Sequence, residues 1–383
     1  MSNLNLNLAK TILKKPLKPN TMSSSLVLFT FYFILIIKGG GCNGAGVALE
    51  SASRGLKALV VEEYDFASGA SSKSTKLIHG GVRYLQEVFS LYGTHRQEKF
   101  ELVVEALRER SYMIQNAQYL NKPLPTVIPT NSLFTTLYYY VGSIVYHMIY
   151  YLFDDERNIT MMPLPYILGQ QEVFSIFPKL DKRVKYGVTY FDGQTNDARM
   201  NMDLLLTSTL DNYIQDKTYK PANILNYTKL VDFVKDAQGN ITGGVILDKT
   251  TNKQYTIKAK CAINCTGPYA DAVRQLDNPK IPSRIIPVEG SHLVMDKHLG
   301  HRKFGLLIPR TTDGRVLFIL PWLHYSLVGT TDQRVEKAEI DPTVPMNDMQ
   351  FIVGELNKLY PETSTVEVSS SILAKWSGTE LRF

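Results

Sequence analysis

The sequence contains few cysteines. Only three occur among its 383 residues, Cys42, Cys261 and Cys265, and they form no CxxC pair and have no histidine at metal-ligand spacing. A disulfide scaffold and a structural zinc site are therefore not expected. Cys261 and Cys265 lie on or beside an apolar run, where we expect small buried side chains rather than a redox pair.

A strong net charge is also missing. The formal net charge is +6, and the basic residues are not gathered into a block with interleaved aromatic residues. We therefore expect no nucleic-acid partner, although a mildly basic surface suits anionic substrates or an anionic membrane. The chain is 44% hydrophobic and 20% charged, which is typical of a globular protein, and its length predicts two domains.

No acidic residue occurs before Glu50, whereas four lysines between Lys10 and Lys18 precede an apolar stretch over residues 26–37. This pattern predicts a targeting-like extension over residues 1–30. A secretory signal is the alternative, but no small-residue cleavage site follows the apolar stretch. Twelve apolar residues are too few to span a bilayer, so we expect residues 33–37 to form a buried strand.

A glycine-rich turn follows this strand. The sequence runs from Lys38 into Gly-Gly-Gly-Cys-Asn-Gly-Ala-Gly over residues 39–46 and then into a helix-like segment. In a dinucleotide site Gly39 would make the tight turn, Gly41 would let the backbone approach a pyrophosphate, and Gly44 would let the helix pack on the strand. The exposed amides at the start of the helix would then hold negative charge.

A second strand over residues 58–61 ends in Glu62. An acid about 20 residues past the glycines is placed to accept hydrogen bonds from a ribose. Strand, glycine turn, helix, strand and acid in this order predict a Rossmann-type dinucleotide-binding domain. The alternative is a glycine-rich turn with no ligand.

Two helical stretches and several strands are expected further along the chain. Residues 95–116 are typical of a helix. Residues 133–153 are apolar but carry six tyrosines and His147, which argues against a continuous membrane crossing. Core packing and monotopic membrane contact both remain open for this stretch. Strand-like segments without long helices between them predict an antiparallel sheet. These segments are residues 187–191, 243–247, 255–264, 284–295, 315–321 and 326–331.

Several long blocks resemble FAD-linked glycerol-3-phosphate dehydrogenases, in that family's order. One reads Ser-Thr-Lys-Leu-Ile-His-Gly-Gly-Val-Arg-Tyr within residues 62–85, and the others are residues 190–201, 263–271, 314–322 and 329–332. The resemblance implies an α/β (α+β) fold of the glutathione-reductase-like superfamily. In it a FAD-binding Rossmann-type domain, residues 31–125 and 180–275, is interleaved with an antiparallel-sheet substrate or cap domain, residues 126–179 and 276–372.

The resemblance also implies a reaction. It is the oxidation of sn-glycerol 3-phosphate to dihydroxyacetone phosphate by hydride transfer to FAD, with the electrons passed to ubiquinone at the mitochondrial inner membrane. Peripheral or monotopic membrane association follows from this location, and a homodimer is left open.

Cofactor contacts are carried over from the family. The predicted FAD site comprises Gly39, Gly41, Gly44, Glu62, Ser71, Ser72, Thr75, Lys76, Leu77, His79, Thr266 and Gly267. Hydroxyls and backbone amides over residues 71–77 suit a pyrophosphate and a flavin edge. Without the resemblance, residues 71–77 would be interpreted as a solvated Ser/Lys loop. His79 would be the capping histidine of a turn, and Thr266 and Gly267 would be an ordinary strand end.

Substrate contacts are predicted in the same way. Arg83 with Tyr84 is the candidate phosphate site, because the guanidinium of an arginine can donate two parallel hydrogen bonds to a phosphate. His292 is the candidate base, and its alternative is a satisfied core histidine. Arg310 and Thr331 are weaker candidates for phosphate or hydroxyl contacts. Asp197 and Arg199 are expected to form a structural pair.

The chain departs from the family in two places. Lys38 stands between the first strand and the glycines, and we expect the strand to slip or bulge to accommodate it. Residues 373–383 enter the family's Trp-Ser-Gly-Ile-Arg-Pro block and then diverge, so that its arginine is missing. An active flavoenzyme is the first expectation. A truncated, catalytically inactive fragment with impaired FAD binding is the alternative.

Overall fold

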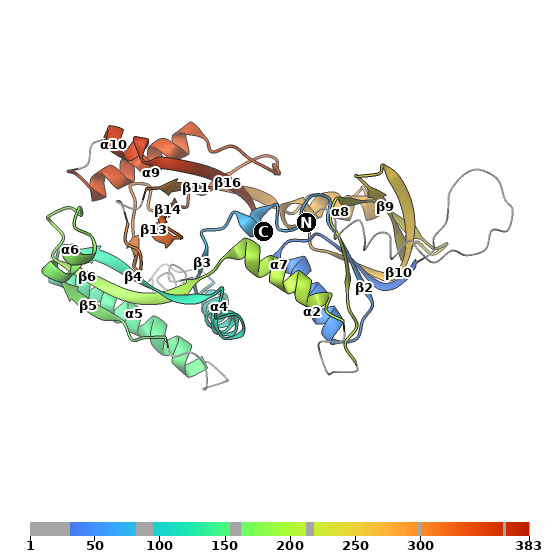
Figure 1. Cartoon of the computed structure of the whole chain (residues 1–383), viewed down its shortest axis with the longest axis horizontal. Helices are drawn as coiled ribbons and strands as arrows, with labels where there is room; N and C mark the ends of the chain where they lie inside the picture. Colours follow the sequence, from blue (N-terminus) through green and yellow to red (C-terminus); the bar gives the residue numbers. More distant parts are fainter. Residues whose placement is uncertain are drawn as a thin grey trace. The chain divides into compact units, whose positions relative to one another are not determined.

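The computed structural model describes residues 31–81, 95–153, 162–211, 218–296, 300–362 and 365–382. They form two compact units, each with its own sheet (Figure 1). The first unit contains the described residues up to Ser68 and Asn201–Ile285, and the second contains those of Gly69–Met200 and Ile286–Phe383. The described residues of 69–125 and 180–200 thus lie in the second unit, although the predicted FAD-binding domain included these ranges. The ligand-binding role of each predicted domain stays a prediction.

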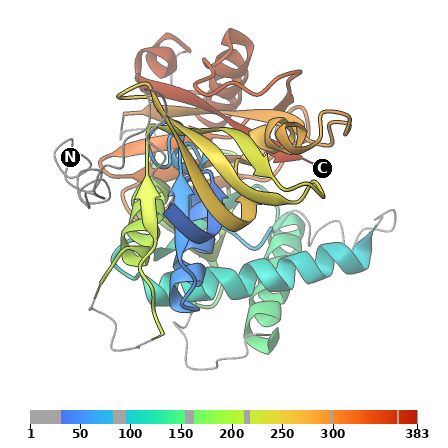
Figure 2. The same ribbon diagram turned by 90° about the vertical axis from the view of Figure 1, so that its right-hand side faces the viewer.

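A six-stranded sheet organises the first unit. Its strand order is β7-β2-β1-β10-β9-β8, and the yellow strands β8 and β9 lie nearest the viewer in Figure 2. β1, β2, β7 and β10 run parallel, whereas β9 pairs antiparallel with both β10 and β8. The elements are β1 (Phe31–Lys38), α2 (Cys42–Ser53), β2 (Ala58–Val61), β7 (Asn223–Leu225), β8 (Thr228–Lys235), β9 (Ile241–Asp248), β10 (Lys253–Asn264) and α8 (Ala270–Asp277). The predicted order of strand, glycine turn, helix and strand is confirmed.

Lys38 is the last residue of β1 and causes no bulge. β1 keeps one register against β10 from Phe31 opposite Ile257 to Lys38 opposite Asn264. The expected slip is therefore wrong, because Lys38 occupies an ordinary strand position instead of being an extra residue. Strand alternation sends its side chain away from α2, and its Nζ donates to the carbonyl of Leu230 at 3.3 Å.

The two faces of this sheet bury separate clusters. Ile37 and Val60 pack with Ala45 and Ala48 of α2 on one face. Ile36 packs on the other face with residues from β8, β9 and β10, including Leu230, Ile246 and Ile257. Small alanines bring α2 close to the strands, which sets where the helix begins.

A ten-stranded sheet organises the second unit. Its order is β15-β11-β14-β13-β12-β4-β6-β3, with β16 also paired to β11 and β5 to β6. Its strands are β3 (Leu77–Ile78), β4 (Lys122–Thr130), β5 (Tyr166–Gly169), β6 (Tyr186–Gln194), β11 (Ile286–Met295), β12 (Gly305–Ile308), β13 (Leu317–Trp322), β14 (Tyr325–Gly329), β15 (Gln333–Arg334) and β16 (Ile372–Arg382). Its helices are α4 (Arg96–Asn116), α5 (Leu133–Phe153), α6 (Gln170–Ile176), α9 (Met346–Leu359) and α10 (Thr365–Ser370), and α7 (Asp197–Ser208) continues into the first unit.

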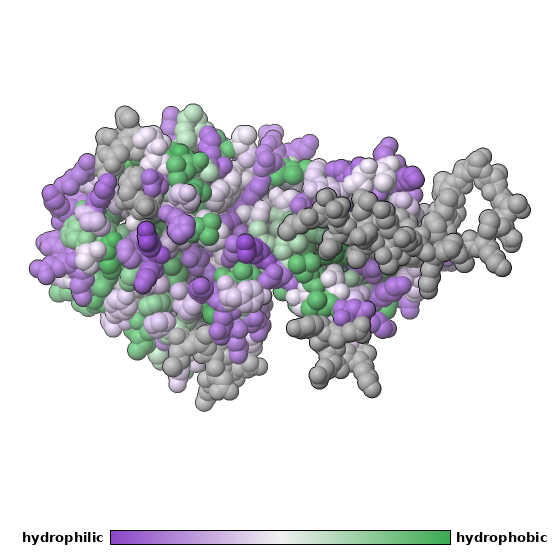
Figure 3. Space-filling model, in the orientation of Figure 1, coloured by the Kyte–Doolittle hydropathy of each residue, from purple (hydrophilic) through white to green (hydrophobic). Residues whose placement is uncertain are grey.

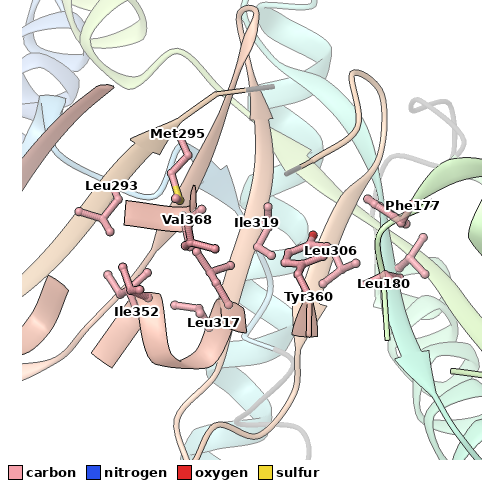
Figure 4. Packing of buried hydrophobic residues seen from close by; sticks show 14 of the residues in the cluster. Phe177, Leu180, Leu293, Met295, Leu306, Leu317, Ile319, Ile352, Tyr360 and Val368 are labelled. Atoms are coloured by element: carbon pink, nitrogen blue, oxygen red, sulfur yellow. The ribbon is translucent and has the colours of Figure 1, made fainter. Parts of the chain in front are cut away.

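Helices cover this sheet through two cores. In one, Leu293 and Met295 of β11 and Leu317 and Ile319 of β13 pack against Ile352 of α9 (Figure 4). In the other, side chains of α4 and α5 cover β4 and β6. The predicted antiparallel pairing is confirmed for β11, β13 and β14. The predicted helices over residues 95–116 and 133–153 are confirmed as α4 and α5. None of the described helices meets the length and apolarity needed to cross a membrane.

A buried ion pair ties α4, α5 and β6 together. Arg110 of α4 lies 2.6 Å from the Asp192 carboxylate, and their side chains are 2% and 1% exposed. The hydroxyl of Tyr146 in α5 donates to the same oxygen at 2.8 Å and accepts from the N–H of Gly80 at 2.6 Å. Burying these charges is tolerable because each has a partner.

Replacing Arg110 with methionine should lower the free energy of unfolding of the second unit by about 3 to 5 kcal/mol, because Asp192 would stay buried without its cation. Urea denaturation measures this change. As a control, Arg54→Met removes an exposed i,i+4 pair with Glu50 and should change the free energy by less than about 0.5 kcal/mol. Equal effects of the two variants would contradict the role of the buried pair.

Candidate functional site

The glycine turn of the first unit leaves no room for side chains. Gly39 has φ +109°, and a Cβ there would lie 2.4 Å from the carbonyl oxygen of Cys265. A Cβ on Gly44 would lie 1.8 Å from the carbonyl oxygen of Gly39. Glycine at these two positions therefore lets the turn, the end of β10 and the first turn of α2 come into contact.

The start of α2 presents backbone amides rather than side chains. Gly41 is its N-cap residue, and the first turn contains no acidic residue and no side-chain cap. Such a helix start favours negative charge, because its first N–H groups lack partners within the helix. Asn201 fixes the turn from the other side by donating to the Gly40 carbonyl at 2.9 Å. These features suit a pyrophosphate.

Glu62 lies at the end of β2, beside this turn. One carboxylate oxygen accepts the N–H of Gly40 at 2.7 Å, and the other accepts the N–H of Tyr64 at 2.9 Å. Each oxygen has a second lone pair that is suited to a ribose hydroxyl. The predicted ribose acceptor is thus held against the glycine turn by backbone contacts.

The end of β10 adds a third side to this group. The Thr266 hydroxyl donates to Asn264 Oδ1 at 2.7 Å, and the Asn264 amide donates to the Ala270 carbonyl at 2.9 Å. Gly267 follows with φ +54°. Thr266 lies beside the glycine turn, since a Cβ on Gly39 would lie 3.2 Å from the Thr266 nitrogen, and the contact of Thr266 and Gly267 with FAD stays a prediction.

In the second unit, Lys76 is the centre of the segment over residues 71–80. It is 5% exposed, and its Nζ donates to both oxygens of Asp197 at 2.8 and 2.7 Å and to the Ser72 carbonyl at 2.5 Å. Its ammonium also lies over the rings of Trp322 and Trp376, at 5.7 and 5.2 Å. Burial lowers the pKa of Lys76, while the charge of Asp197 opposes this shift.

A cavity of about 250 Å³ opens beside this pair. Its walls include Ser72, Lys76, Asp197, Trp322 and Trp376. Two indole rings, a carboxylate and an ammonium at one cavity suit a planar ligand with polar edges. Asp197 pairs here with Lys76 and with Ser74, and not with Arg199 as predicted, because the loop brings the lysine to the carboxylate.

His292 lies in the same unit, buried in β11. Its side chain is 3% exposed, its Nε2 shares a hydrogen bond of 2.9 Å with the Thr75 hydroxyl, and its ring stacks on Trp376 at 5.6 Å. Burial, together with the charge of Lys76, lowers the pKa of His292 to about 3. The imidazole is therefore neutral at working pH.

A network of hydroxyls positions the strand that carries His292. Asp348, which is 2% exposed, accepts hydrogen bonds from Ser291 at 2.6 Å, Thr331 at 2.5 Å and Gln333 at 2.5 Å. Thr331 was a candidate for substrate contact, but its hydroxyl proton is committed to Asp348. Its hydroxyl oxygen also accepts the N–H of Ser291 at 2.9 Å. Thr331 therefore supports the histidine strand.

The other predicted site residues differ in position. Ser71 and Leu77 are half-buried in the loop and in β3, and His79 is exposed, with its Nδ1 accepting the N–H of Gly81 at 3.0 Å. Arg310 is exposed. Arg83 and Tyr84 lie outside the described residues. Cys261 is exposed and Cys265 is half-buried, so the expectation of buried thiols is wrong for Cys261.

Sequence reasoning missed several residues of these sites. Asp197 as the partner of Lys76, and both tryptophans of the cavity, were not selected. Trp322 and Trp376 are the two tryptophans of the chain, and each lies within a segment that resembles a block of the family. That rarity is the signal that could have identified them, because tryptophan is favoured at ligand-binding surfaces.

Comparison with known families matches residues 35–382 to FAD dependent oxidoreductases. The chain belongs to this family. FAD is therefore the cofactor of the family, and the α/β fold with a Rossmann-like FAD-binding part is confirmed.

Within this family, the chain is similar to glycerol-3-phosphate dehydrogenases. The chain is 40% identical over 351 residues to the probable mitochondrial glycerol-3-phosphate dehydrogenase of Dictyostelium discoideum, covering 90% of this chain and 52% of the relative. It is 36% identical over 356 residues to the human mitochondrial glycerol-3-phosphate dehydrogenase, covering 91% and 46%. The structure resembles the glycerol-3-phosphate dehydrogenase of Bacillus halodurans in complex with FAD, with a TM-score of 0.67, 26% identity and coverage of 92% and 57%. The chain thus spans about half the length of the curated relatives it matches.

The residues of the first unit fit the adenosine diphosphate half of FAD. The space at Gly39 and Gly44 that a Cβ would fill lets the backbone approach a pyrophosphate, and the uncapped start of α2 supplies N–H donors. Glu62 would hold the ribose. In the second unit, the loop with Ser72, Lys76 and the tryptophan-lined cavity supplies groups that suit a flavin edge.

Gly44→Ala should raise the Kd for FAD at least about tenfold, because the new methyl would collide with Gly39 and push α2 from the turn. Isothermal titration calorimetry with FAD measures this. The matched control is Gly46→Ala in the same helix, where a Cβ meets nothing within 4 Å. That variant should keep the wild-type Kd, and an equal loss in both variants would contradict the fit.

The buried His292 should make stability sensitive to acid. Its folded pKa of about 3 lies below its ordinary value of 6.5, so between these values the unfolded chain binds a proton that the native chain does not. Lowering the pH from 6.5 to 3 should therefore cost about 1.4 kcal/mol per pH unit more in the wild type than in His292→Gln. Urea denaturation at several pH values gives the difference.

The exposed His95 supplies the control for this measurement. Its side chain is 75% exposed, so His95→Gln removes no buried contact and should follow the wild-type profile. Parallel profiles for the wild type and His292→Gln would show that His292 is not held neutral.

Proposed function

We propose that the chain oxidises sn-glycerol 3-phosphate to dihydroxyacetone phosphate, with FAD as acceptor. The observation that carries the proposal is the identity of 40% and 36%, over 90% and 91% of the chain, to two proteins named mitochondrial glycerol-3-phosphate dehydrogenase. The same names support a mitochondrial location. When bound, FAD would be the acceptor for the hydride that leaves the secondary carbon of the substrate.

The chain's own residues are proposed to bind and orient the reactants. Gly39, Gly41 and Gly44 would hold the pyrophosphate, and the cavity beside Lys76 would hold the flavin edge. The buried ammonium of Lys76 would favour negative charge at that edge. Arg83 is proposed to bind the substrate phosphate with Tyr84, since a guanidinium can donate two parallel hydrogen bonds to it.

His292 is proposed to accept the proton of the substrate hydroxyl. Its neutral imidazole has a basic nitrogen, and the hydrogen bond between Nε2 and Thr75 gives a route for the proton through that hydroxyl. Because a pKa of about 3 makes the imidazole a weak base, it would take up the proton only as the hydride leaves the same carbon, and not before.

The test uses the whole chain loaded with FAD under anaerobic conditions. Glycerol 3-phosphate should bleach the flavin absorbance and reduce an added dye, whereas glycine and D-alanine should not. Arg83→Met should raise KM for glycerol 3-phosphate by about tenfold or more with a smaller change in kcat. Arg54→Met changes an exposed arginine at the C-cap of α2 and serves as the control.

Two results would contradict the proposal. Flavin bleaching by an amino acid alone would reject the substrate. A folded but colourless preparation that cannot be loaded with FAD would favour the alternative, an inactive fragment with impaired FAD binding.

Electron transfer to ubiquinone at the inner membrane is part of this proposal, and α5 supports it. Apolar side chains on the outer face of α5 are exposed, among them Phe134 (83%), Val141 (58%), Tyr151 (67%) and Leu152 (65%). Its opposite face packs into the core. Figure 3 shows apolar residues on the lower left of the molecule, where Figure 1 places α5. An amphipathic surface rich in tyrosine suits a membrane interface.

The double variant Phe134→Glu/Val141→Glu should therefore reduce binding to anionic phospholipid vesicles by about tenfold or more. Vesicle flotation measures the bound fraction. Leu323→Glu changes a residue that is 76% exposed elsewhere in the same unit and should leave binding unchanged. If the α5 variant instead loses only self-association in analytical ultracentrifugation, a second copy of the chain covers this face.

A further inference from the structure

A second cavity lies in the first unit, on the face of its sheet opposite α2. It has a volume of about 150 Å³. Its walls come from β1, β8, β9, β10 and α8 and are mostly apolar. The apolar residues are Ile36, Leu230, Phe233, Ile241, Ala262, Ile263 and Val273, and the others are Lys38, Asn264, Arg274 and Asp277. Neither the glycine turn nor the tryptophan-lined cavity uses the apolar residues, so the proposed function gives this cavity no role.

Lys38 brings a charge to this apolar cavity. It follows Ile37, which packs on the α2 side, so alternation directs Lys38 to the cavity side together with Ile36. The hydrogen bond of its Nζ to Leu230 is long, and an ammonium has further N–H donors to satisfy. Burial lowers the pKa of Lys38. A half-buried cation of this kind loses part of its hydration, and pairing with an anion would compensate for that loss.

The carboxylates near this cavity have partners of their own. The pairs are Glu63 with Lys229 at 3.0 Å, Asp277 with Lys235 at 2.8 Å and Asp271 with Arg274 at 2.6 Å. Glu62 accepts two backbone N–H groups. Among the described residues, none of these carboxylates comes within ion-pair distance of Lys38. Within the part of the chain that the structure describes, the Lys38 charge therefore has no direct counter-ion.

We propose that this cavity binds a small monocarboxylate with an apolar tail of about six carbons. The size follows from the volume, since a cavity of roughly 150 Å³ holds a six-carbon ring. The carboxylate would pair with Lys38, and the tail would contact Phe233, Ile241 and Val273. Inorganic phosphate would satisfy the ammonium but would leave the apolar walls uncovered, which disfavours it.

The experiment titrates hexanoate into the full chain by isothermal titration calorimetry. Saturable binding is expected, with Kd raised at least about tenfold in Lys38→Met, which keeps the side-chain length but removes the charge. Lys253→Met, at the exposed start of β10, is the matched control and should bind as the wild type does. Hexanol and inorganic phosphate should each bind much more weakly than hexanoate. Unchanged binding by Lys38→Met, or phosphate binding as tight as that of hexanoate, would overturn the proposal.

A second measurement needs no variant of Lys38. Acetic anhydride labels accessible amines, and mass spectrometry then reports the labelling of each lysine. Hexanoate should protect Lys38 and leave Lys253 labelled, and equal labelling of Lys38 with and without hexanoate would reject the site. Neither measurement uses FAD or glycerol 3-phosphate, so failure of this inference and failure of the proposed function are distinguishable.

Discussion

The contact between Gly44 and the carbonyl of Gly39 sets the geometry of the first unit. Because no side chain separates them, α2 begins directly on the turn that leaves β1, and the same absence at Gly39 lets the carbonyl of Cys265 approach. β1 pairs in parallel with both β2 and β10, so the carboxyl ends of the three strands lie side by side at this turn. The N–H of Gly40 holds the Glu62 carboxylate at the same place. This contact suits the proposed dinucleotide site, because the start of α2 lies at the turn and has no side-chain cap for its backbone N–H groups.

Three cations that are shielded from water show three ways of placing a charge in this fold. Arg110 pairs with Asp192 and has tyrosine rings beside it, so its charge is satisfied inside the protein. Lys76 pairs with Asp197 but also borders a cavity, which makes it available to a ligand. Lys38 borders a cavity, and among the described residues it donates one long hydrogen bond to a backbone carbonyl. From Arg110 to Lys76 to Lys38 the charge is thus paired less completely inside the protein. An external anion therefore has most to stabilise at Lys38.

The local order of the first unit could be predicted from the sequence because each of its signals is short-range. Glycines at positions 39 and 44, the apolar strand before them and Glu62 after the second strand specify the turn almost alone. The strand β4 was not predicted, because its prolines are typical of a loop, yet it pairs with β6 along its whole length. Likewise, Lys38 suggested a bulge, because the sequence does not reveal a cavity that receives its side chain.

The candidate sites depend on contacts between residues far apart in the chain, which a single sequence does not supply. His292 meets Thr75, 217 positions away, and Trp376 meets the Lys73 carbonyl, 303 positions away. The resemblance could indicate His292, but only the packing shows that Trp376 and Thr75 enclose it. Enclosure restricts its chemistry, because an imidazole that is removed from water stays neutral. It could then accept a proton but could not serve as a cationic group for a phosphate. In the proposed reaction the positive charge at the substrate phosphate would therefore have to come from other residues.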